Sequence, residues 1–214
     1  MYHYLDLNPR CNLYFFGKTL FFLLLVHGLF LSQSTSGLSE TKIYVYAAAS
    51  TRNALDELIK EFPKESNVQV SAVYGATSAL ARQIMDGAPA ALFLSANRGW
   101  MKEVIDAKLI AKHKNAFSNR LVLISSKRYA TDIKINSAQD IVKAIKEDRI
   151  AVAEISAVPA GIYSKQAMDS LKIWDQLKNK LAQSANVRAA LALVERGETP
   201  LGIVYQTDAR ASPY

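Results

Sequence analysis

The chain has few of the residues on which most enzymes and metal sites depend. Its 214 residues include one cysteine, Cys11, and three histidines. A single cysteine excludes a disulfide within the chain and a thiolate metal cluster. Cys11 lies in the N-terminal segment considered below, so the rest of the chain also has no cysteine nucleophile.

The remaining residues offer little for catalysis. His113 is the one histidine after that N-terminal segment, and it stands between two lysines. A Ser-His-Asp arrangement would require His113 to reach a serine from this lysine-rich stretch. There is no His-x-x-His pair and no cluster of carboxylates for a metal ion. The composition allows a Ser–Lys dyad on Ser50, but no Ser-x-x-Lys sequence begins there. We therefore expect that the protein is not an enzyme.

The charge is positive and dispersed. The formal net charge is +7, from 26 lysines and arginines against 19 aspartates and glutamates. No block of five or six lysines occurs, whereas nucleic-acid-binding proteins typically cluster their basic residues. Half of the residues are apolar, as in globular proteins. The composition favours a globular protein whose mild positive field attracts a small anion.

The first 36 residues are typical of an export signal. Arg10 and Lys18 precede an apolar core at 20–31, and small polar residues follow at 32–37. A core of this length is short for a membrane span, which needs roughly 20 residues. We predict a signal peptide over residues 1–36. A retained membrane anchor is the alternative, because no strict Ala-x-Ala cleavage pattern follows the core.

Beyond this segment, strand and helix patterns alternate. This alternation predicts an α/β fold with mainly parallel sheets flanked by helices. We expect lobe one over residues 37–122 and lobe two over 123–206, with 207–214 starting a return to lobe one. The predicted strands are 43–46, 68–74, 92–95, 120–125, 149–153 and 201–205, and the predicted helices are 53–62, 78–86, 98–107, 138–147, 162–171 and 187–197.

Several junctions between strands and helices are candidates for anion binding. The first predicted strand runs through three alanines to Ser50, and Gly75-Ala-Thr77-Ser78 follows the second. N–H groups at helix starts lack partners within the helix and favour anions. Each hydroxyl could instead cap its helix. In the second lobe, residues 158–163 form a loop that leads into a helix, Val187 begins another helix, and Tyr205 ends a strand.

These stretches resemble the periplasmic molybdate-binding proteins of molybdate ABC transporters, which belong to the type II periplasmic solute-binding family. The resemblance implies two lobes with the ligand in the cleft between them. It also implies export to the periplasm, a membrane permease and its ATPase as partners, a monomer, and no cofactor. The matching stretches are residues 45–50, 78–84, 87–90, 92–96, 100–101, 158–163, 186–196 and 200–205.

The resemblance further implies a site of neutral hydrogen-bond donors for molybdate or tungstate, without direct ligands to the metal. The donors fall on Ser50, Thr77, Ser78, Ala160, Val187 and Tyr205. Arg52, beside Ser50, is unusual in the family and could add a charge there. Asn97 stands where the family commonly has aspartate.

Two alternatives remain open at the level of the sequence. One is a binder of another tetrahedral oxyanion, such as sulfate. The other is a truncated copy that no longer binds, because relatives continue for a few tens of residues beyond Tyr214.

Overall fold

The computed structural model describes residues 41–62, 67–126, 129, 137–145 and 147–213. The predicted signal peptide, residues 1–36, lies outside these ranges. Residues 38–214 form one compact unit, and it contains two separate sheets. Within the described ranges, no helix has both the length and the apolar character that crossing a bilayer requires.

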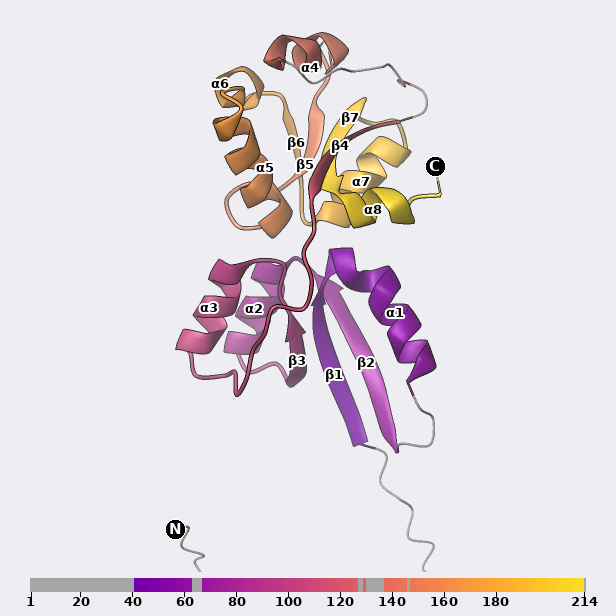
Figure 1. Ribbon diagram of the computed structural model, residues 1–214, viewed down its shortest axis with the longest axis vertical. Helices are drawn as coiled ribbons and strands as arrows, with labels where there is room; N and C mark the ends of the chain where they lie inside the picture. Colours follow the sequence, from indigo (N-terminus) through magenta and orange to yellow (C-terminus); the bar gives the residue numbers. More distant parts are fainter. Residues whose placement is uncertain (1–40, 63–66, 127–128, 130–136, 146, 214) are drawn as a thin grey trace, which may run out of the picture. The chain divides into compact units, whose positions relative to one another are not determined.

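The first sheet consists of three parallel strands in the order β2-β1-β3. They are β1 (Thr41–Ala48), β2 (Val68–Gly75) and β3 (Ala90–Leu94). The chain moves along the sheet in one direction from β1 to β2 and in the opposite direction from β2 to β3, so right-handed crossovers place the two connecting helices on opposite faces. Figure 1 shows α1 on one side of the sheet and α2 and α3 on the other. The helical segments are η1 (Ala49–Thr51), α1 (Arg52–Glu61), α2 (Thr77–Met85) and α3 (Arg98–Asp106). We call β1 to α3 the first half.

The second sheet has the order β4-β7-β5-β6, with β4 antiparallel to β7 and the other pairs parallel. All four residues of β5 are buried, as expected for a strand covered on both faces. The strands are β4 (Leu121–Ser125), β5 (Ile150–Ala153), β6 (Leu181–Ser184) and β7 (Leu201–Tyr205). The helices are α4 (Ala138–Ile145), α5 (Pro159–Ser170), α6 (Trp174–Leu177), α7 (Val187–Glu195) and α8 (Gln206–Ala211). We call β4 to α8 the second half.

The packing of α7 on the second sheet depends on a glycine. A Cβ atom at Gly202 of β7 would lie 2.6 Å from Cγ2 of Val194. Real Cβ atoms do not approach so closely, so any larger residue would push α7 away from the sheet.

The predicted α/β class with mainly parallel sheets is confirmed. The predicted start of one helix was wrong, because α5 begins at Pro159 and not at residue 162. Proline suits the first position of a helix, where no N–H is needed. The prediction also missed η1, β6, α6 and α8. The strand β4 lies wholly in the second sheet, and α8 contacts α7, β4 and β7.

Candidate ligand-binding site

A small cavity lies where strands of both sheets end. Ala48 of β1 is paired with Gly75 of β2, so the carboxyl ends of these two strands are level, and both residues border the cavity. Tyr205, the last residue of β7, borders it from the second half. The volume of the cavity, about 20 Å³, is of the order of that needed for one water molecule. Five of the six predicted donors lie in its wall: Ser50, Thr77, Ala160, Val187 and Tyr205.

Ser50 lies in the middle of the 3-10 turn η1, so it does not cap α1. The neighbouring Thr51 donates its hydroxyl to the Ala48 carbonyl at 2.7 Å and so stabilises the turn. Within the described residues the Ser50 hydroxyl makes no hydrogen bond, and it borders the cavity. It is therefore available to a ligand.

Thr77 has a fixed hydroxyl. Its Oγ1 accepts the Ala96 N–H at 3.0 Å, and only 1% of the residue is exposed. Because the oxygen already accepts this bond, the hydroxyl proton is left to donate elsewhere. Ser78 is also buried, but it is not part of the wall. Neither side chain caps α2, whose N-cap residue is Ala76.

The start of α5 presents N–H groups from the second half. Pro159 occupies the first helical position, and the N–H of Ala160 has no partner in the described part of the chain. Gly161 is required here, because a Cβ atom would lie 2.1 Å from the carbonyl oxygen of Glu154. The loop before α5 therefore packs directly against the helix start.

Glu154 holds this loop in place. Its carboxylate accepts the N–H of Ser156 at 2.8 Å and the N–H of Ala157 at 2.9 Å. Burial opposes ionisation, but hydrogen bonds from Ser156, Ala157 and Val158 prevail and lower the pKa of the Glu154 carboxyl. The loop is therefore organised by an ionised side chain at neutral pH.

Asn186 caps the start of α7. Its Oδ1 accepts the N–H of Arg188 at 3.0 Å and the N–H of Ala189 at 3.1 Å. These bonds satisfy the second and third helical residues. The N–H of Val187, the first helical residue, makes no hydrogen bond in the described ranges, and Val187 lies in the wall. Sequence reasoning missed Asn186, although asparagine before a helix is a recognised capping signal.

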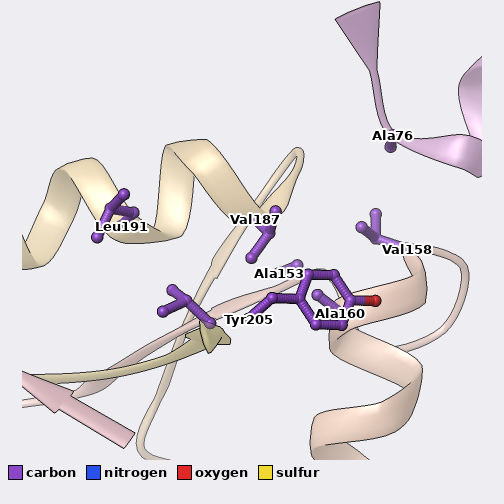
Figure 2. Packing of buried hydrophobic residues seen from close by; sticks show 8 residues of the cluster. Ala76, Ala153, Val158, Ala160, Val187, Leu191 and Tyr205 are labelled. Atoms are coloured by element: carbon purple, nitrogen blue, oxygen red, sulfur yellow. The ribbon is translucent and has the colours of Figure 1, made fainter. Parts of the chain in front are cut away.

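Tyr205 completes the wall with a hydroxyl that lacks a partner. The residue is 6% exposed, and its hydroxyl oxygen is buried with no hydrogen bond among the described residues. Figure 2 shows the ring extending past Ala160, with the oxygen at its far end. Burial raises the pKa of the Tyr205 phenol, and Tyr163 and Asp208 act in the same direction. The phenol is therefore a neutral donor.

The wall contains no charged side chain. Arg52 does not border the cavity, because its guanidinium lies over the Tyr74 ring, 4.3 Å from the centroid. The expectation that Arg52 could place a charge beside Ser50 therefore finds no support in this geometry. The described residues also contain no group of three or more His, Cys, Asp or Glu side chains that could hold a metal ion.

A larger cavity, of about 240 Å³, lies between β4, α7 and α8. Its lining includes Glu195 and Arg196, together with apolar side chains such as Leu191 and Val194. None of the predicted donors borders it, and its lining carries side chains of both charges. The smaller cavity therefore fits the predicted chemistry better than the larger one.

Hydrogen bonds join the two halves on either side of the small cavity. Nδ2 of Asn97 donates to the Tyr163 hydroxyl at 2.9 Å, and Nε1 of Trp100 donates to the Ala157 carbonyl at 2.8 Å. Oδ1 of Asn97 also accepts the Trp100 N–H, which makes Asn97 the N-cap of α3. One side-chain amide therefore caps a helix of the first half and bonds to a residue of the second half. A third bond runs from Nη2 of Arg188 to Oδ1 of Asn53, at 2.8 Å.

Residues 43–213 match the family model described as bacterial extracellular solute-binding protein. The chain belongs to this family. The molybdate-binding protein ModA of Escherichia coli is 46% identical over 176 residues, covering 81% of this chain and 68% of that protein. ModA of Haemophilus influenzae is 38% identical over 192 residues, covering 88% and 74%.

A solved structure agrees with these relatives. The substrate-binding domain of a putative molybdenum ABC transporter from Clostridium difficile is 34% identical, with a TM-score of 0.58, and the match covers 80% of this chain and 74% of that one. The resemblance inferred from the sequence is thereby confirmed, and the fold is that of a solute-binding protein.

Proposed function

We propose that this protein is the substrate-binding component of an ABC importer and that it binds molybdate, and also tungstate, in the small cavity. The buried Tyr205 hydroxyl without a partner carries the proposal, because it lies in a wall free of charged side chains. A buried polar group without a hydrogen bond costs roughly 1–3 kcal/mol. An oxyanion acceptor removes that cost.

The halves act as the two lobes of the binding protein, and each supplies part of the donor set. The first half supplies the hydroxyl and N–H of Ser50 and the hydroxyl of Thr77. The second half supplies the N–H groups of Ala160 and Val187 and the phenol of Tyr205. Ser78, which lies outside the wall, stays a prediction from the sequence.

Neutral donors suit this ligand for a physical reason. Stripping water from a dianion is costly, and buried counter-charges carry a desolvation cost of their own. N–H groups at helix starts are already aligned and need little reorganisation. About six charge-assisted bonds of about 1.5–3 kcal/mol each oppose an association cost of roughly 4–15 kcal/mol. A dissociation constant between micromolar and nanomolar lies within the range that these terms leave.

Selectivity follows from size and from the absence of acceptors. We expect the larger molybdate, once the halves accommodate it, to reach donors on both halves at once, and the smaller sulfate to reach fewer of them. Phosphate carries a proton near neutral pH, and a wall made of donors offers that proton no acceptor. Tungstate has nearly the shape of molybdate, so we expect it to bind as well.

The cellular role follows from the same proposal. The signal peptide at residues 1–36 directs the protein to the periplasm, where it acts as a monomer and delivers its ligand to a membrane permease driven by an ATPase. The protein binds and releases the oxyanion unchanged, so it needs no cofactor and performs no catalysis. The two ModA proteins and the substrate-binding domain of the putative molybdenum ABC transporter from Clostridium difficile support this role.

The test is thermal unfolding of the protein with molybdate, tungstate, sulfate or phosphate. A ligand that binds only the native state raises the unfolding midpoint. We expect an increase with molybdate and tungstate and none with sulfate or phosphate. An equal increase with sulfate would favour a general oxyanion binder, and a cooperative transition that no oxyanion shifts would refute the proposal.

A further inference from the structure

Arg188 lies directly after Val187, which borders the cavity, and joins α7 to α8 and to α1. Its Nε donates to Oδ1 of Asp208 in α8, and its Nη2 donates to Oδ1 of Asn53 in α1 at 2.8 Å. Through these bonds the start of α7 is connected to α8 in its own half and to α1 in the other half. No charged side chain borders the cavity itself, so Arg188 acts beside the site and not within it.

Asp208 determines where the guanidinium lies. Its side chain is completely buried, whereas that of Arg188 is 24% exposed. The second carboxylate oxygen of Asp208 accepts the N–H of Tyr205 at 3.3 Å. One carboxylate therefore fixes both Arg188 and the backbone of the residue whose phenol faces the cavity. The guanidinium needs no rearrangement to meet the first half.

Asn53 is the partner that separation of the halves would remove. It lies in the first turn of α1, three residues after Ser50, and it is exposed. If the halves separated, α1 would move away from α7 and the bond from Arg188 to Asn53 would break, whereas the bond between Arg188 and Asp208 lies within the second half. The contact with Asn53 therefore belongs to the closed arrangement.

We propose that Arg188, held by Asp208, is a positioning residue whose bond to Asn53 keeps the halves closed and sets the rate at which the oxyanion leaves. This inference rests on the proposed function, because it assigns a role in ligand retention at the same site. Asn97 and Trp100 join the halves at the α3–α5 side. The Arg188–Asn53 bond closes the side formed by α1 and α7.

The test uses Asn53→Ala, because Asn53 is exposed and its truncation leaves the core intact. We expect molybdate to dissociate about 3- to 10-fold faster, as for loss of one exposed hydrogen bond of ordinary strength. The association rate and the unfolding midpoint without ligand stay unchanged, which a merely structural role would not produce. Stopped-flow displacement of molybdate by excess tungstate, followed by tryptophan fluorescence, measures the rate.

Two further variants sharpen the result. Asn53→Asp keeps an acceptor for the guanidinium, so its dissociation rate stays at or below that of the unaltered protein. Asn115→Ala removes the same side-chain amide from an exposed position in the segment between α3 and β4 and leaves the rate unchanged.

The outcomes separate this inference from the proposed function. Normal molybdate binding with equal dissociation rates in the unaltered protein and Asn53→Ala would overturn the role of Arg188 alone. Faster dissociation in Asn53→Asp, equal to that in Asn53→Ala, would also overturn it. Failure of the unaltered protein to bind any of the four oxyanions would overturn both.

Discussion

Nε of Arg188 lies 2.5 Å from Oδ1 of Asp208, and the aspartate side chain is completely buried. Burial raises the pKa of the Asp208 carboxyl, and the guanidinium opposes that effect. The pair therefore balances desolvation against attraction. Removing one partner leaves the other as a buried charge without compensation, so a single substitution in this pair should lower the stability of the protein.

Replacement of Asp208 by alanine tests this balance. We expect Asp208→Ala to lower the free energy of unfolding by about 2–4 kcal/mol, because Arg188 and the Tyr205 N–H both lose an acceptor. Asp175→Ala is the matched control, since that side chain is 86% exposed in its pair with Lys178. Asp175→Ala should cost far less stability than Asp208→Ala, because an exposed ion pair contributes little. Denaturant unfolding measures both, and equal losses would contradict the assignment.

Removal of the Tyr205 hydroxyl should affect binding and stability in opposite directions. Tyr205→Phe loses a donor to the oxyanion, so we expect affinity to fall by about 1.5–3 kcal/mol. The ligand-free protein should be as stable as before or more stable, because the substitution deletes a buried hydroxyl without a partner. Titration calorimetry and thermal unfolding measure the two effects. Unchanged affinity would mean that the phenol does not contact the ligand.

Thr77 and Ser78 are adjacent buried residues, but Thr77 borders the cavity and Ser78 does not. Thr77→Val keeps the shape of the side chain but removes its oxygen. We expect at least about a tenfold loss of affinity, together with about 1 kcal/mol of stability from the lost bond to the Ala96 N–H. Ser78→Ala should leave affinity nearly unchanged. The reverse ranking in calorimetry would move the contact to Ser78.

The affinity for molybdate should be independent of pH between about 6 and 10. Tyr205 is the one titratable residue in the wall, and burial raises the pKa of its phenol. The phenol therefore keeps its proton, and remains a donor, beyond the pH at which an ordinary tyrosine ionises. Calorimetry across this range provides the test. A loss of affinity centred near pH 10 would indicate a phenol with an ordinary pKa.

The sequence predicted the elements that carry a strong periodic pattern. The strands β1 and β2 and the helices α1 and α2 begin and end within two residues of the predictions. β6 was missed because Leu181–Ser184 is short and lacks alternation, so its pairing with β5 is what makes it a strand. The start of α5 was missed because proline and glycine suggested a loop.

In the candidate site, too, local sequence patterns predicted some residues, whereas others are brought together by the tertiary structure alone. Ser50, Thr77, Ala160, Val187 and Tyr205 were found through local motifs that resemble a family, and they meet at one cavity. The contacts of Asn53, Arg188 and Asp208 were not predicted. These residues lie far apart in the chain, and each has ordinary surroundings in the sequence. Their association exists only through the tertiary structure.

Asn186 determines how many donors α7 presents. Its amide oxygen accepts two of the N–H groups in the first turn and leaves that of Val187. The helix therefore offers a ligand a single point of attachment and not an open cluster. An anion that recognises several neighbouring N–H groups at once finds no such cluster here, so one asparagine outside the donor set narrows the range of anions that the protein can recognise.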